Sequence, residues 1–138
     1  MKFPGTPPLL DTDTLSEVLK LRNLSVARHA REYLDHYQRF HFSIITRFEI
    51  LRGLLAKAAS RQIERFEIQC RKSVVLPLSD AVVVRASEHY AHLRGRGALI
   101  SDADLLIAAT AQIHGSELVT ENIDHYSRIP GLSLHSWR

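Results

Sequence analysis

Three carboxylates in this chain stand where an apolar segment meets the start of an expected helix. They are Asp11, Glu49 and Asp104. In an open α/β sheet such positions gather along the carboxyl ends of the strands, where ligands bind. Acidic side chains gathered there fit a divalent ion, because Mg²⁺ prefers oxygen ligands. This chemistry points to metal-assisted attack of water on a phosphodiester. We also expect at least one raised pKa among the three, because like charges repel.

Each acid also has a structural interpretation. The spacings Thr46-x-x-Glu49 and Ser101-x-x-Asp104 both match a capping box, in which the acid serves the start of its own helix. Asp11 fits that interpretation less well, because Thr14-x-x-Glu17 supplies a box for the same helix. Helix capping therefore stays open as the alternative for Glu49 and Asp104.

Four further polar residues lie near these acids in the sequence. Asp13 and Asp102 each stand two residues from a main candidate, so on one helix they point to a different side. Asp102 caps its helix or reaches the rim of the site. Asn122 and Asp124 follow an apolar run, where Asn122 caps a helix or places an amide oxygen near a metal ion or its water.

Composition predicts one soluble globular domain over residues 1–138. Hydrophobic residues make up 45% and charged residues 24% of the chain. No apolar run has the length of a membrane span, and the start, residues 1–5, lacks a signal-peptide core. The single cysteine, Cys70, has no partner for a disulfide, which indicates a reduced thiol in a cytoplasmic protein. The net charge of +3 is compatible with nucleic acid.

Short apolar runs alternate with helical patterns along the whole chain. Strands are expected at residues 8–10, 41–44, 74–77, 117–120 and 133–135. Helices are expected from residue 14, then over residues 25–38, 46–59, 60–72, 79–95 and 101–114, with a turn or short helix at 122–127. This alternation predicts βαβ units and a mostly parallel sheet.

Two helical segments carry more apolar surface than one small core needs. They are residues 30–37 and 51–58. The second belongs to a helix on which Phe48, Leu51, Leu54 and Leu55 are expected to share one face. We therefore expect a homodimer.

Four stretches of the chain resemble sequence motifs of one known family. Residues 9–16 resemble its opening Leu-Asp-Thr-Asn motif, with Asp13 in place of the asparagine, and residues 43–53 resemble its second motif, which contains Glu49. Residues 100–109 resemble the third motif, and residues 118–122 with 129–132 resemble the closing segment. In this order they resemble the PIN-domain nucleases, and specifically the VapC-type toxins of toxin–antitoxin modules.

The resemblance implies a PIN-like three-layer α/β fold with a central, mostly parallel sheet of four to five short strands flanked by helices. It implies a Mg²⁺ or Mn²⁺ site held by Asp11, Glu49 and Asp104. The fourth acidic position of the family falls near Asn122, where Asp124 or Asp102 could substitute. The resemblance also implies dimers and an antitoxin whose tail blocks the cleft. Polar groups close to the metal would be Thr12, Ser16 and Thr120.

These observations together predict a Mg²⁺- or Mn²⁺-dependent endoribonuclease, the toxin of a toxin–antitoxin pair, in which a metal-activated water hydrolyses RNA. RNA or the antitoxin would be contacted by Arg47, Arg52, Arg94 and Arg96. A haloacid-dehalogenase phosphatase or a response-regulator receiver fits poorly, because both need a late lysine and none follows Lys72. The alternative that stays open is a non-catalytic, PIN-like RNA-binding or scaffolding domain.

Overall fold

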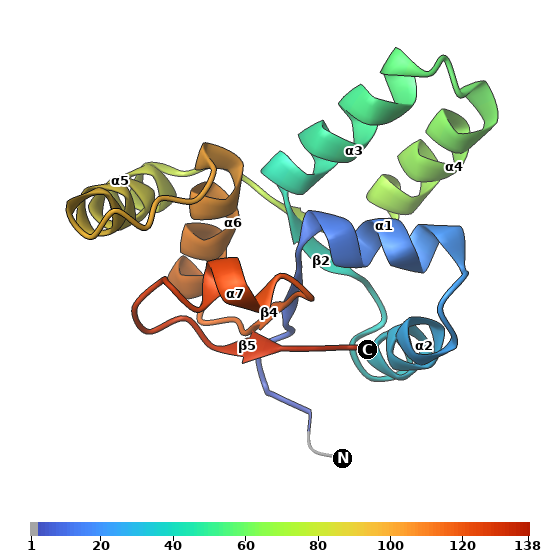
Figure 1. Ribbon diagram of the computed structural model, residues 1–138. Helices are drawn as coiled ribbons and strands as arrows, with labels where there is room; N and C mark the ends of the chain where they lie inside the picture. The colour runs from blue at the N-terminus through green and yellow to red at the C-terminus, as the bar shows by residue number, and fades with distance from the viewer. Residues whose placement is uncertain (1–2) are drawn as a thin grey trace.

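The computed structural model describes residues 3–138, and in this part of the chain five short strands form one sheet (Figure 1). The strands are β1 (Leu9–Leu10), β2 (His41–Ser43), β3 (Val74–Leu76), β4 (Leu118–Val119) and β5 (Leu134–His135). Their order is β3-β2-β1-β4-β5, and every neighbouring pair is parallel. Met1 and Lys2, the beginning of the expected lead-in, lie outside the described residues.

Seven helices connect and cover these strands within residues 3–138. They are α1 (Thr12–Lys20), α2 (Leu24–Tyr37), α3 (Ile44–Ala56), α4 (Ser60–Arg71), α5 (Asp80–Gly95), α6 (Asp102–Ile113) and α7 (Ile123–Tyr126). None of these helices combines the length and the apolar character that crossing a bilayer requires.

The two faces of the sheet bury different residues of the same strands, because successive side chains on a strand point to opposite faces. On one face Leu9 and Leu118 pack with α5 and α6. On the other face Leu10 and Val119 pack with helices α1 to α4. Figure 1 shows these helices on either side of the strands. The expected three-layer α/β arrangement is confirmed, and the sheet is parallel throughout.

The strand order reverses direction at β1. The chain adds β2 and β3 on one side of β1 and then β4 and β5 on the other. Leu10 of β1 therefore pairs with Phe42 of β2 and with Val119 of β4. In parallel α/β sheets the crevice at such a reversal, beyond the carboxyl ends of the strands, is where ligands bind. Asp11 is the residue that follows β1 at this crevice.

Two helices begin earlier than their expected capping boxes. Asp11 itself caps α1, and its carboxylate accepts the backbone N–H of Thr14 at 2.8 Å. Ser43 caps α3 by accepting the N–H of Ile45 at 3.0 Å. The predicted boxes beginning at Thr14 and Thr46 were wrong, because each helix already has a capping side chain at the end of the preceding strand. Ser101 caps α6 as expected.

The apolar residues around Asp104 had suggested that it follows a strand. The structure shows instead that no strand precedes it. Helix α6 follows α5 through the loop at residues 96–101, and Asp104 lies in the first turn of α6. The apolar run after Asp104 forms the buried helix interior, with Ile107 and Ala108 both 0% exposed. Asp104 reaches the site from a helix start.

The apolar face expected on α3 is split between the core and the solvent. Leu51 and Leu54 pack partly against the core, whereas Phe48 is 57% and Leu55 58% exposed. On α2, by contrast, Ala30 and Tyr33 are buried within the protomer. Residues 30–37 of α2 therefore give little exposed apolar surface for a dimer, whereas α3 still exposes such surface.

Replacing Phe42 by alanine should lower the free energy of unfolding by about 3–5 kcal/mol, because this side chain is fully buried on β2. Phe48→Ala removes the same atoms from an exposed position on α3 and should cost less than about 1 kcal/mol. Urea denaturation of both variants measures the difference. Equal losses would contradict the described burial.

Candidate functional site

The carboxylate of Asp11 is buried beyond the carboxyl ends of β1 and β4. Its residue is only 3% exposed. Oδ1 accepts the N–H of Thr14, and Oδ2 accepts the hydroxyl of Thr120 at 2.5 Å. Because Thr120 follows β4, this second hydrogen bond joins the two strands that flank the reversal point.

Burial raises the pKa of Asp11 from 3.8 to about 6. The hydrogen bonds from Thr120 and Thr14 act in the opposite direction and offset part of the rise. A raised pKa was expected from repulsion among the acids. The main cause is instead loss of water around the carboxylate, and repulsion from Asp13 is a minor contribution.

Glu49 extends from the second turn of α3. Its Oε1 accepts the hydroxyl of Thr12 at 2.6 Å, and the Thr12 oxygen lies 3.0 Å from the hydroxyl of Thr46. The guanidinium of Arg52, one turn later, lies 3.7 Å from the other carboxylate oxygen of Glu49. Helices α1 and α3 are thus joined through polar side chains at the edge of the crevice.

Asp104 is held by the short helix α7. Its Oδ1 accepts the hydroxyl of Tyr126 at 3.0 Å, and its Oδ2 lies 3.8 Å from Nδ1 of His125. His125 also lies within 2.9 Å of the side-chain nitrogen of Asn122. This places Asn122 at the edge of the site, beside Asp104.

The hydroxyl of Tyr126 contacts Asp104 and lies close enough to Asp11 and Glu49 to feel their charge. Burial holds the pKa of this phenol well above its usual range, and the nearby charges of Asp104, Asp11 and Glu49 raise it further. Nevertheless, within residues 3–138 no three His, Cys, Asp or Glu side chains form a group that could hold one ion. Each carboxylate is held by a hydroxyl of its own, so the site is an acidic cluster without a closed ligand cage.

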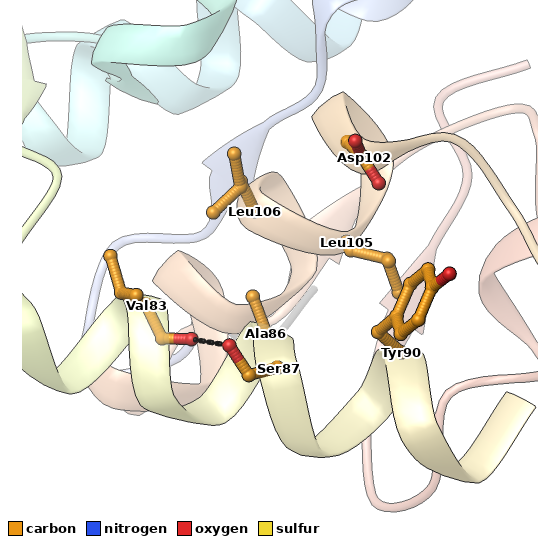
Figure 2. Close-up of a pocket in the computed structure, with 7 residues that line it drawn as sticks. All are labelled: Val83, Ala86, Ser87, Tyr90, Asp102, Leu105 and Leu106. Atoms are coloured by element: carbon orange, nitrogen blue, oxygen red, sulfur yellow. Dashed lines mark hydrogen bonds between the residues drawn. The ribbon is translucent and has the colours of Figure 1, made fainter.

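The remaining predicted site residues, two acids and two neutral polar residues, differ in position. Asp102 is exposed on the other side of α6, where Figure 2 shows it beside a groove between α5 and α6. Asp124 is exposed on α7. Asn122 occupies the N-cap position of α7 without a side-chain capping bond, and its backbone N–H donates to the hydroxyl of Thr120. Ser16 lies one turn beyond Thr12 on α1 and is half-buried.

Only one of the four predicted arginines contacts a site acid. Arg52 pairs with Glu49, and its guanidinium also lies 5.0 Å from the centre of the Phe48 ring. Arg47 instead forms an ion pair and two hydrogen bonds with Glu67 on α4. The other two, Arg94 and Arg96, are exposed at the end of α5.

The sequence interpretation missed three polar residues of the site. Thr46 had been assigned to a cap, and His125 and Tyr126 had been treated only as part of a turn or short helix. The sequence offered one signal for Tyr126: it lies on the short helix α7, which comes soon after β4. Its role depends on a contact with Asp104, 22 residues away, which no local pattern reveals.

Comparison with known proteins gives a consistent result. Residues 9–132 match the family model described as PIN domain. The chain is 30% identical to Ribonuclease VapC1 of Methanocaldococcus jannaschii, covering 91% of this chain and 83% of the relative. It is 27% identical to the tRNA(fMet)-specific endonuclease VapC of Salmonella typhimurium, covering 94% and 96%. The structure of DNA-bound VapBC from Salmonella typhimurium superposes with a TM-score of 0.85 at 25% identity, covering 96% of this chain and 99% of that one.

The raised pKa of Asp11 predicts how stability changes with pH in metal-free buffer. Between its ordinary value of 3.8 and about 6, the folded protein keeps a proton that the unfolded chain releases, so wild type loses stability as pH rises through this window. Asp11→Asn lacks this loss. Its free energy of unfolding relative to wild type should therefore be higher at pH 7 than at pH 4, by about 3 kcal/mol at most.

Thermal denaturation at both pH values, with EDTA present, measures this difference. Asp13→Asn removes a charge from an exposed side chain two residues away and is the matched control. Its stability should follow the wild-type profile. An Asp11→Asn profile parallel to wild type would contradict the assigned burial cost.

Proposed function

The chain belongs to the PIN-domain family, and on that premise we propose that it is a VapC-type ribonuclease that hydrolyses RNA phosphodiesters with a divalent metal ion. The observation that carries the proposal is that Asp11, Glu49 and Asp104, from three separate elements, each accept a hydrogen bond from a hydroxyl and keep a carboxylate oxygen on the same side of the sheet's strand ends as Tyr126. Asp11 directly follows β1, at the reversal of the strand order, where ligands bind in parallel α/β sheets.

The donor set fits Mg²⁺ or Mn²⁺ in its chemistry, and the PIN-domain family is generally metal-dependent. Mg²⁺ in phosphoryl-transfer sites binds through one or two carboxylates, substrate phosphates and its own waters, so a complete protein cage is not required. Asp11 and Asp104 are proposed as the principal ligands and Glu49 as the third acid. The cost of burying the charge of Asp11 supports this, because a bound cation offsets that cost.

When bound, such an ion stabilises negative charge on the phosphate and lowers the pKa of a water molecule. The protein groups orient this chemistry. The hydroxyls of Thr120 and Thr12 restrict the carboxylates of Asp11 and Glu49. Arg52, partly neutralised by Glu49, offers its guanidinium to a neighbouring phosphate. Water forms the new bond to phosphorus and the bond to the ribose 3′-oxygen breaks, which leaves 5′-phosphate and 3′-hydroxyl ends.

A protein partner is part of the proposal. VapC relatives belong to VapBC toxin–antitoxin systems, and an exposed apolar stripe on α3 suits a docking segment beside the site. The stripe consists of Ile44, Phe48 and Leu55, which are 37%, 57% and 58% exposed. Their spacing places them on one side of the helix. A cytoplasmic location and a homodimer remain part of the proposal, the latter testable by sedimentation at tens of micromolar.

The proposed activity predicts RNA cleavage that depends on a divalent metal. With Mg²⁺ or Mn²⁺, wild type should cleave total RNA. The RNAs tested should include tRNA(fMet), because one relative is named for it. Asp104→Asn should reduce the rate by more than the roughly 10- to 100-fold typical of changes outside the ligand shell. Asp102→Asn, two residues away and exposed on α6, should retain the wild-type rate.

Mapping of the product ends and an EDTA control complete this experiment. Cleavage that continues in EDTA, or 2′,3′-cyclic phosphate ends, would exclude metal-dependent hydrolysis. Binding of RNA without cleavage in any metal would favour the non-catalytic RNA-binding or scaffolding alternative.

The proposed partner predicts a complex between this chain and an antitoxin, which we expect to be the small protein encoded beside it. Phe48→Ala should weaken their complex by about 30-fold, the effect of losing one interface hot spot of roughly 2 kcal/mol. The control Leu24→Ala removes a still more exposed apolar side chain from α2, because Leu24 is 86% and Phe48 57% exposed. Titration calorimetry compares them. Equal affinities for the two variants would place the antitoxin elsewhere.

A further inference from the structure

Each of the three site acids accepts a hydrogen bond from a hydroxyl on a different segment of the chain. Thr120, after β4, donates to Asp11, and Thr12, on α1, donates to Glu49 on α3. The third donor is Tyr126 of α7, whose hydroxyl reaches Asp104 on α6. The two threonines lie within the motifs that resemble the family. Tyr126 lies between the two closing stretches that resemble the family, at residues 118–122 and 129–132, and its contact with Asp104 is seen in this structure.

The hydroxyl of Tyr126 is placed by the core. Tyr126 is 2% exposed and belongs to the cluster that contains Leu105, Ile107 and Leu118. The aromatic ring has only two side-chain torsions and is packed on all sides, so the oxygen at its tip has little freedom. Asp104, at 23% side-chain exposure, is more open to solvent and gains a fixed direction from this contact.

Tyr126 acts only as a donor toward Asp104. The carboxylate of Asp104 can only accept, and the phenol hydroxyl lies 3.0 Å from its Oδ1, so the hydroxyl donates this hydrogen bond. One oxygen of Asp104, Oδ1, is therefore committed to this bond. The other, Oδ2, faces His125 at 3.8 Å, beyond hydrogen-bond distance, and keeps its lone pairs for another ligand.

We propose that Tyr126 is a positioning residue that fixes the carboxylate of Asp104 for a divalent ion through its hydroxyl. This inference rests on the proposed function, because it assigns a role in holding the same metal. In metal sites, groups that orient a ligand from outside typically contribute 10- to 100-fold to metal affinity. The corresponding loss is expected when the Tyr126 oxygen is removed.

The test compares Mn²⁺ binding, measured by titration calorimetry, for wild type, Tyr126→Phe and Tyr90→Phe. Tyr126→Phe keeps the buried ring and removes one oxygen, and its Mn²⁺ dissociation constant should rise by about 10- to 100-fold. Tyr90→Phe is the matched control, because Tyr90 lies 41% exposed at the groove between α5 and α6 (Figure 2). Its affinity should equal that of wild type.

A second measurement separates positioning from a structural contribution. Loss of a structural hydrogen bond would lower the unfolding midpoint of Tyr126→Phe equally with and without Mn²⁺. A positioning role predicts a smaller Mn²⁺-induced rise in the midpoint than wild type shows. In an Asp104→Asn background, Tyr126→Phe should cause little further loss of Mn²⁺ affinity, because the group that it positions has lost its charge.

The outcomes distinguish this inference from the proposed function. If wild type binds no Mn²⁺, the metal-dependent function fails and the role of Tyr126 fails with it. If wild type binds Mn²⁺ and Tyr126→Phe binds it equally well, the function stands and the positioning role is overturned. Independent losses in the Asp104→Asn background would likewise overturn the positioning role.

Discussion

The side chain of Asp11 brings a carboxylate into the interior of this protein, where burial raises its pKa to about 6. The groups around this carboxylate offset part of the cost of burying its charge. Hydrogen bonds from Thr14 and Thr120 stabilise the charge, and both donors are fixed in turn by the central strands. The hydroxyl of Thr14 donates to the carbonyl of Val119 at 3.2 Å, so the start of α1 is tied to β4. The charge of Asp11, the N-cap of α1 and the pairing of β1 with β4 therefore depend on one another.

The other two acids extend the same principle outward from the core. Glu49 and Asp104 are more exposed than Asp11, and each receives a hydroxyl donor from a neighbouring helix. Neutral donors orient a carboxylate without cancelling its charge, whereas a lysine or arginine would cancel it. Within residues 3–138, the basic side chains beside the three acids are Arg52, 3.7 Å from Glu49, and His125, 3.8 Å from Asp104. The cluster therefore keeps the negative charge that a divalent cation needs, while the chain as a whole carries a net charge of +3.

The sequence predicted the five strands because they depend on short local patterns, whereas the metal-binding role of Asp11, Glu49 and Asp104 stays a prediction. Each strand is a brief apolar run, and a parallel sheet brings the ends of such runs together. The local sequence pattern gave the wrong N-caps where two residues near a helix start could both cap it. Thr14 and Thr46 looked like caps, but Asp11 and Ser43 stand closer to the strand ends and cap first.

Long-range contacts were the second source of error. The helical period placed Phe48 and Leu55 with Leu51, although α3 meets the core along a narrower strip than the period implied. Tyr126 could not be assigned from the sequence, because its significance lies in a hydrogen bond to a helix 22 residues earlier. Such contacts become visible only after the layers have been assembled.

The most direct test of this account is a crystal structure of the protein soaked with Mn²⁺, with an anomalous difference map calculated at the manganese absorption edge. The account predicts a peak within coordination distance of carboxylate oxygens of Asp11 and Asp104, with Glu49 beside it, and loss of that peak in Asp11→Asn. A map without a peak in this crevice, or with manganese bound only at other acids, would contradict the assignment of these carboxylates as a metal site.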